Sequence, residues 1–343
     1  MATYLGSKVG QLCRIQLAGL AVFVAGIGIL TSQPTFADEG GVSFWLPGQF
    51  GSLAAAPGQA GWSFASIYYH TSVDADGGKN FRIGGGVQSG LHARADLALL
   101  NATYTSAAPI FGAQAAIGVT GLVGRNKVDV DATLTGPFGN TISGSRSDTT
   151  SGVGDLYPRA TLKWNLGVHN VMIYTQWGLP VGTYEPNRLA NLGIGHWAAD
   201  GGAGYTYFNP QTGREFSAVL GFTYNFKNPD TDYKNGINLH LDWAASQFLS
   251  QQVHVGVVGY LYNQLTGDSG SGATLGDFKS RVAGIGPQIG YRFPIAEMQG
   301  YLNVKGYYEF AAENRPEGWN AWLTFAISPA TPGAPPTTRL VRK

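Results

Sequence analysis

The stretch Gly90–Tyr104 alternates between apolar and polar side chains through most of its length. Its apolar positions are Leu91, Ala93, Ala95, Leu97 and Leu99, and the ionisable positions between them are His92, Arg94 and Asp96. Successive side chains of a β-strand point to opposite faces, so the pattern predicts a strand with one apolar and one ionisable face. Ordinary strands average about five or six residues, whereas a tilted strand that crosses a bilayer needs about nine to eleven. The length therefore predicts a membrane-spanning strand whose apolar face contacts lipid and whose ionisable face lines a wet lumen.

The same alternation returns along the chain, with turn-forming residues between the repeats. The predicted strands are Trp62–His70, Gly90–Tyr104, Phe111–Gly124, Gly152–Leu166, Val171–Gly178, Gly201–Phe208, Glu215–Phe226, Ile237–Ala245, Gln252–Leu265, Ser280–Phe293, Gln299–Phe310 and Trp319–Ile327. Long connections follow the third, fifth, seventh and ninth strands, and the first of these is a polar loop over residues 125–150. Short turns follow the even-numbered strands. Long and short connections therefore alternate, as in a barrel with extracellular loops and periplasmic turns.

Taken together, the segments predict an all-β fold, a transmembrane antiparallel up-and-down β-barrel of about 12 strands, although about ten or fourteen would also agree with the weaker segments. Closure leaves no strand edge whose backbone lipid would have to satisfy. Tryptophans lie near the predicted strand ends, as in an aromatic girdle: Trp62, Trp164, Trp177, Trp197, Trp243 and Trp319. The alternative is a soluble β-fold with these rings in its core, but such a core does not need strands of about ten residues.

The first residues indicate export. Lys8 and Arg14 precede the apolar run Leu17–Leu30, which is too short to span a membrane, and Thr35-Phe36-Ala37 offers a cleavage site. We predict a cleaved signal peptide over residues 1–37, an N-terminal segment over 38–61, an outer-membrane β-barrel over 62–327 and a Pro-rich C-terminal tail over 328–343. The only cysteine, Cys13, leaves with the signal, which excludes a disulfide framework.

Composition supports a membrane barrel and weakens other classes. Charged residues make up 13% of the chain, about half the share in soluble domains. The chain has 22 Lys and Arg and 21 Asp and Glu, so removal of Lys8 and Arg14 with the signal leaves a net charge of −1. The mature chain has no excess of basic residues that would attract nucleic acid, and we expect no nucleic-acid partner.

The N-terminal segment has no strand pattern but is rich in large apolar residues. Exposed in the periplasm, such a patch would be a liability. We therefore hypothesise that the segment folds into the lumen as a plug, and that deletion of Gly41–Ala56 raises single-channel conductance. Its candidate plug residues are Phe44, Trp45, Leu46, Pro47 and Phe50.

Polar and aromatic residues on one parity of several strands are the candidate lumen lining. They are His92, Arg94, Asp96, Asp155, Tyr157, Arg159, Lys163, His240, Asp242, His254, Tyr260, Tyr262, Tyr301, Lys305, Tyr307 and Glu309. About eight strands leave a barrel filled by side chains and about sixteen leave a water channel, so about twelve predict a narrow path. Tyrosine rings beside hydrogen-bonding groups suit small aromatic solutes. The alternative is that the charges only brace a closed barrel.

Several stretches also carry a resemblance to a known family. They are residues 39–51, Pro57-Gly58 with Trp62, residues 179–184 with 189–193, residues 228–236, residues 264–270 and residues 284–290. These stretches resemble the outer-membrane protein family named for the meta-pathway of phenol degradation, over roughly Glu39 to Ile327. The resemblance implies an outer-membrane transporter often encoded near aromatic-compound catabolism. The tail after Ile327 departs from a barrel that ends with its last strand.

Catalytic and metal-binding motifs are missing from the sequence. No Gly-x-Ser-x-Gly elbow, His-Glu-x-x-His or Gly-x-Gly-x-x-Gly fingerprint occurs, so we expect no enzyme and no cofactor. The acid pairs Asp230/Asp232 and Asp129/Asp131 are expected to be solvated loop acids, because hard cations need more oxygen ligands.

We therefore expect an outer-membrane channel for passive uptake of small hydrophobic or aromatic, phenol-like compounds. The alternative is a closed outer-membrane barrel with a structural or loop-mediated binding role. The expected partners are outer-membrane lipid, the barrel-assembly machinery and a small hydrophobic or aromatic solute.

Overall fold

The computed structural model describes residues 43–80, 86–273 and 279–330. The predicted signal peptide, residues 38–42 of the N-terminal segment and the tail from residue 331 lie outside the described residues. Within the described ranges, no helix combines the length and the apolar character needed to cross a membrane.

Twelve antiparallel strands form a closed barrel in which each strand pairs with its neighbours in sequence and β1 pairs with β12. The strands are β1 (Gly61–Asn80), β2 (Gly86–Thr105), β3 (Gln114–Thr135), β4 (Thr141–Leu166), β5 (His169–Gly178), β6 (Ala198–Asn209), β7 (Arg214–Asn225), β8 (Asn238–Phe248), β9 (Val253–Gln264), β10 (Arg281–Ile295), β11 (Met298–Glu313) and β12 (Glu317–Pro329). The predicted fold class, an up-and-down barrel of about 12 strands, is confirmed. The last strand reaches Pro329, slightly beyond the predicted start of the tail.

The two ends of the barrel differ in their connections. Short turns join β2 to β3, β4 to β5, β6 to β7, β8 to β9 and β10 to β11, and β1 begins and β12 ends at this same end. We call it the inner end. Longer loops, residues 179–197, 226–237 and 265–280, leave β5, β7 and β9 at the opposite, outer end. In outer-membrane barrels the longer loops are extracellular and the short turns periplasmic.

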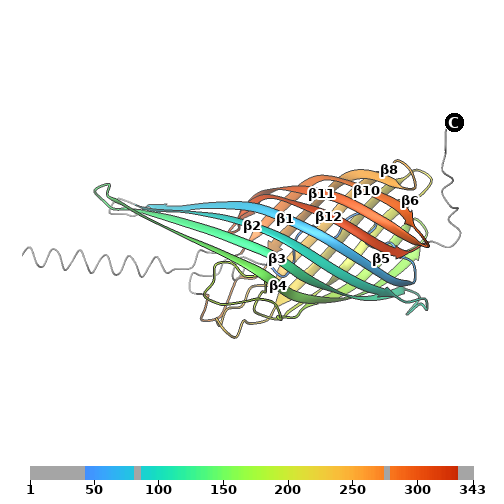
Figure 1. Cartoon of the computed structure of the whole chain (residues 1–343), viewed down its shortest axis with the longest axis horizontal. Helices are drawn as coiled ribbons and strands as arrows, with labels where there is room; N and C mark the ends of the chain where they lie inside the picture. Colours follow the sequence, from blue (N-terminus) through green and yellow to red (C-terminus); the bar gives the residue numbers. More distant parts are fainter. Residues whose placement is uncertain (1–42, 81–85, 274–278, 331–343) are drawn as a thin grey trace, which may run out of the picture. The chain divides into compact units, whose positions relative to one another are not determined.

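The first four strands are much longer than the others at the outer end (Figure 1). β3 has 22 residues and β4 has 26, whereas β5 has 10. The predicted polar loop over residues 125–150 is therefore wrong, because β3 continues to Thr135 and β4 begins at Thr141. Beyond the lipid, a strand can carry polar side chains on its outer face and still pair with its neighbour, so polarity alone did not distinguish a loop there from a strand.

The outward face of the barrel carries an apolar band. On the β1–β3 side this band ends at a single cross-strand row, in which His70 pairs with Asp96 and Asp96 with Arg125. The next row toward the inner end has Tyr68, Ala98 and Val123 instead. Asp96 accepts hydrogen bonds from Tyr68 (2.5 Å) and contacts the His70 ring nitrogen (2.7 Å). The strands above this row project beyond the lipid.

Candidate functional site

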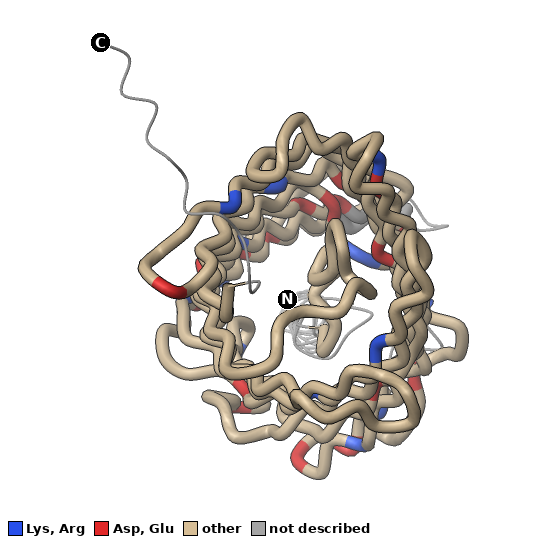
Figure 2. The backbone as a smooth tube through the Cα atoms, turned by 90° about the vertical axis from the view of Figure 1, so that its right-hand side faces the viewer, with Lys and Arg blue, Asp and Glu red and all other residues tan. Residues whose placement is uncertain are grey.

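Residues 43–58 lie inside the barrel, against the inner surface of its wall (Figure 2). Carboxylates of the wall bind backbone amides of this lumenal segment. Asp242 accepts from the N–H of Gly48 (2.9 Å) and of Phe50 (3.0 Å). Glu215 accepts from the N–H of Leu53 (2.9 Å). A segment without secondary structure needs such partners for its buried amides, and the wall supplies them.

Trp45 anchors the outer part of the lumenal segment. Its ring is fully buried and stacks on His240, with ring centroids 3.6 Å apart and planes 13° apart. His240 in turn contacts Asp200 through Nε2 at 2.8 Å, and both residues are buried. Phe44 contacts the ring of Tyr157, with centroids 5.7 Å apart.

Gly48 is needed where the segment passes closest to β11. Its φ is +89°, and a Cβ at this position would lie 2.9 Å from the ring of Tyr307. The Lys305 ammonium donates to the Gly48 carbonyl and, at 3.3 Å, to that of Phe50. An L-residue would meet both backbone strain and a steric clash here.

Basic residues of β4 contact the other side of the segment. The Arg159 guanidinium donates to Gln49 (2.8 Å) and to Gln176 on β5 (2.6 Å), and it lies 4.9 Å from the Phe50 ring centroid. Lys163 donates to the Ala56 carbonyl at 3.2 Å. The segment is therefore held by acids of β7 and β8 and by bases of β4 and β11.

Most of the predicted lumen residues face the inside of the barrel. Besides those already placed, Asp155 contacts the loop 179–197, Tyr260 donates to Glu309 (2.6 Å), and Tyr301 hydrogen-bonds with His254 (3.1 Å). Tyr262 is fully buried beneath the guanidinium of Arg315.

His92 and Asp96 are the exceptions. The apolar residues of β2, including Leu97 and Leu99, face the lumen, so the ionisable parity faces outward. The predicted lumen position is therefore wrong for Asp96, which is bound to Tyr68 and His70, and for His92, which contacts Asp74. Arg94 has the same parity but lines the edge of a cavity described below. The physical reason is that these charges lie above the apolar band, where the outer face meets water.

The lumen also contains contacts that the sequence ranges missed. Asp200 and Ser246 lie just outside the predicted sixth and eighth strands, so no parity was assigned to them. Ser246 binds both Ser52 (2.7 Å) and Gln288 (2.8 Å), and Thr206 accepts from the N–H of Ala55 (3.0 Å). Strands extended by a few residues would have placed Asp200 and Ser246 on the lumen parity, whereas Thr206 already lies within the predicted sixth strand.

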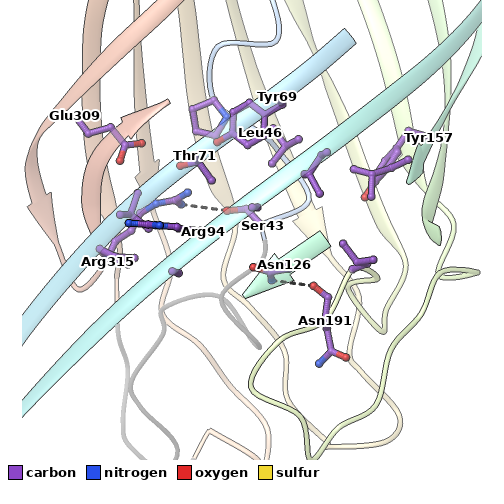
Figure 3. Close-up of a pocket in the computed structure, with 18 residues that line it drawn as sticks. Ser43, Leu46, Tyr69, Thr71, Arg94, Asn126, Tyr157, Asn191, Glu309 and Arg315 are labelled. Atoms are coloured by element: carbon purple, nitrogen blue, oxygen red, sulfur yellow. Dashed lines mark hydrogen bonds between the residues drawn. The ribbon is translucent and has the colours of Figure 1, made fainter. Parts of the chain in front are cut away.

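Two cavities remain beside the lumenal segment, along β1–β4. The outer cavity has a volume of about 120 Å³ and is bordered by Ser43 and Leu46 of the segment and by Tyr69 and Tyr157 of the wall (Figure 3). Arg315 donates to Ser43 at 3.1 Å beside it. The inner cavity, of about 330 Å³, lies between Phe50 and the inner half of the wall. For scale, an apolar cavity of about 150 Å³ can hold one benzene.

The loop 179–197 folds against the inner face of the projecting strands. Asn126 donates to the Asn191 carbonyl at 3.0 Å, beside the outer cavity (Figure 3). Asp148 on β4 accepts from the Arg188 guanidinium (2.7 Å) and from the N–H groups of Leu189 (3.1 Å) and Ala190 (3.2 Å). Asn191 and Leu192 of this loop line the outer cavity.

The loop 226–237 contacts residues 265–273, the described part of the loop that follows β9. Asp232 contacts Lys227 and accepts from the Ser271 N–H (3.0 Å) and hydroxyl (2.5 Å). The Lys227 ammonium, followed by Ser271, holds the pKa of the Asp232 carboxyl well below its usual range. The Asp232 carboxylate therefore stays charged until the pH falls below the pKa of an ordinary carboxyl group. Asp129 lies on β3 rather than in a loop and pairs with Lys127 at 2.8 Å.

A family model described as "Putative MetA-pathway of phenol degradation" matches residues 55–325. The chain belongs to this family. The resemblance noted in the sequence is thus confirmed for the barrel. No curated protein matches the chain.

Among solved structures, the COG4313 outer membrane channel from Pseudomonas putida F1 aligns with a TM-score of 0.62 and 16% identity, over 83% of this chain and 100% of that one. OccAB1 of Acinetobacter baumannii aligns with a TM-score of 0.32 and 9% identity, over 78% and 96%. The CymD monoaromatic hydrocarbon channel aligns with a TM-score of 0.35 and 7% identity, over 78% and 87%. The first alignment supports the barrel fold, and the protein is an outer-membrane β-barrel.

Proposed function

We propose that this family member is an outer-membrane channel for passive uptake of small hydrophobic or aromatic compounds such as phenol. The observation that carries the proposal is the pair of cavities beside the lumenal segment, because side chains and the segment together leave the lumen incompletely filled. Family membership agrees with a phenol-like solute, and the COG4313 protein, described as a channel, has the same fold.

The segment narrows this channel, in our proposal, and makes it selective for small solutes. Residues 43–58 are bound by Asp242, Glu215 and Lys305 in the half of the lumen bordered by β7, β8 and β11. Arg159 and Lys163 of β4 bind the segment from the other side. The half along β1–β4 retains the cavities. A lumen narrowed in this way does not permit general diffusion of hydrophilic solutes.

Uptake by intact cells tests the channel against the closed barrel. The initial rate of radiolabelled phenol uptake is measured in Gram-negative cells with and without the protein in their outer membrane. We expect faster uptake in producing cells. Equal rates would favour a closed barrel, whose structural role would be supported by the many contacts between the segment and the wall.

Deletion of Gly41–Ala56 tests the role of the segment. The deletion removes most of the lumenal segment and leaves its polar partners on the wall hydrated. We expect a higher single-channel conductance in planar bilayers than for the full mature chain. An unchanged conductance would argue that these residues do not restrict the path.

A further inference from the structure

The two cavities are lined by successive lumen-facing positions of the same strands. On β1, Tyr69 lines the outer cavity and Ile67 the inner one. On β2, the corresponding residues are Leu97 and Leu99. Alternate residues of a strand are about 7 Å apart, so about one two-residue repeat of each strand separates the lining of the two cavities.

The wall at this boundary is apolar. Ile67, Leu99 and Leu122 form one cross-strand row, and Tyr69 and Leu97 form the next. Leu97 and Leu99 are each 7% exposed and Leu122 is 4% exposed, which leaves little room between the rows and the segment.

The lumenal segment adds apolar groups from the opposite side. Leu46 and Pro47 line the outer cavity, and Phe50 lines the inner cavity. We call the apolar rows of β1–β3 together with these segment residues the neck. Arg159 also lines the inner cavity, but its guanidinium is bound to Gln49 and Gln176 and lies over the Phe50 ring.

We propose that uncharged solutes about the size of one aromatic ring cross the barrel through this neck, and that the neck excludes ions. The inference rests on the proposed channel function and adds the route and the charge selectivity.

Apart from the Tyr69 hydroxyl, which hydrogen-bonds with Thr71, the polar groups flank the neck on both sides rather than lie within its β1–β3 wall. Thr71 and Asn126 line the outer cavity together with the charged residues Arg94, Glu309 and Arg315. Asn101, Thr103 and Gln114 line the inner cavity together with Arg159 and Lys163. An ion in the neck would lose its hydration, and the basic groups of the adjoining inner cavity, Arg159 and Lys163, already donate to Gln49 and to the Ala56 carbonyl. A neutral ring loses little hydration. Hydrophobic constrictions exclude water and ions in this way. Phenol should therefore pass and benzoate, an anion of similar size at neutral pH, should not.

Cysteine modification tests the route without disturbing folding. The chain contains one cysteine, Cys13, which lies in the predicted signal peptide, so Leu97→Cys gives a mature chain with a single thiol. After assembly in the outer membrane, the cells are treated with N-phenylmaleimide and labelling is verified by mass spectrometry. We expect phenol uptake to fall to the level of cells without the protein. Leu100→Cys is the matched control, because Leu100 lies on the same strand, is 54% exposed and faces lipid.

Three results would overturn the route. They are unchanged uptake after labelling of Leu97→Cys, failure of this thiol to react at all, and wild-type uptake by Leu97→Trp, which fills the neck directly. Heat-dependent migration on gels verifies that each variant is a folded barrel. If wild-type cells take up phenol no faster than cells without the protein, the proposed channel function fails instead, so the two failures are distinguishable.

Ion exclusion is tested by making the neck polar. Leu99→Asn places an amide in the Ile67–Leu122 row, and we expect a higher KCl conductance in planar bilayers than for the wild type. Leu100→Asn, on the lipid side of the same strand, should leave the conductance unchanged. If Leu99→Asn conducts like the wild type, or if benzoate enters as fast as phenol, the neck does not select against charge.

Discussion

At the scale of single residues, Trp45 is the largest side chain of the lumenal segment that is fully buried against the wall. It is fully buried, and its ring lies on His240, which is itself fixed by Asp200. Truncation of a buried tryptophan or phenylalanine to alanine costs about 3–5 kcal/mol. We expect Trp45→Ala to release the segment from the wall and to give larger, fluctuating single-channel currents, whereas Trp45→Phe, which keeps an aromatic ring, should stay closer to the wild type. Wild-type currents from Trp45→Ala would show that other contacts suffice.

The direction in which a residue faces was only partly predictable from the sequence. Period-two alternation correctly separates Leu97 and Leu99 from Asp96, but it does not determine which face is inside. The assumption that apolar residues face lipid succeeds for β8, where Asp242 faces the lumen and Leu241 the outside. It fails for β2, because there the charges lie above the apolar band and the lumen itself is apolar. Whether an outward-facing residue contacts lipid or water depends on its height relative to the membrane. That height cannot be read directly from the sequence.

At the scale of elements, the loop 179–197 depends on one carboxylate of β4. Asp148 binds the Arg188 guanidinium and the next two backbone amides, and charge-assisted bonds of this kind are stronger than neutral ones. We expect Asp148→Asn to loosen the loop and to speed trypsin cleavage after Arg188 in intact cells. Asp129→Asn, which alters contacts with Lys127 and Ser147 within the projecting strands and none with the loop 179–197, is the control. Equal cleavage rates in both variants would mean that other contacts fix the loop.

The observed strand boundaries agree closely with the predicted ones where strands end at the membrane. They agree poorly where strands extend beyond it. β7 (Arg214–Asn225) differs from its predicted range by one residue at each end. The long hairpin of β3 and β4 was predicted as a loop because its residues are polar. In the structure, Val128 is buried with Leu189 and Ala190 of the folded loop, a contact between segments far apart in the chain. Such tertiary partners cannot be read from local patterning.

At the scale of the whole barrel, the apolar band requires a lipid environment. Val257 lies near the middle of β9, faces outward and is 43% exposed. Arginine at the bilayer midplane of such barrels costs about 2–4 kcal/mol, and about 0–1 kcal/mol near the interface. We expect Val257→Arg to lower the free energy of unfolding in phospholipid vesicles by about the larger amount, and His70→Arg, at the edge of the band, to change it little. Urea titration followed by tryptophan fluorescence measures both. If the two variants are equally stable, or if the mature chain stays monomeric in water without surfactant, the outward side chains do not face hydrocarbon, and a lumenal route would then have no membrane to cross.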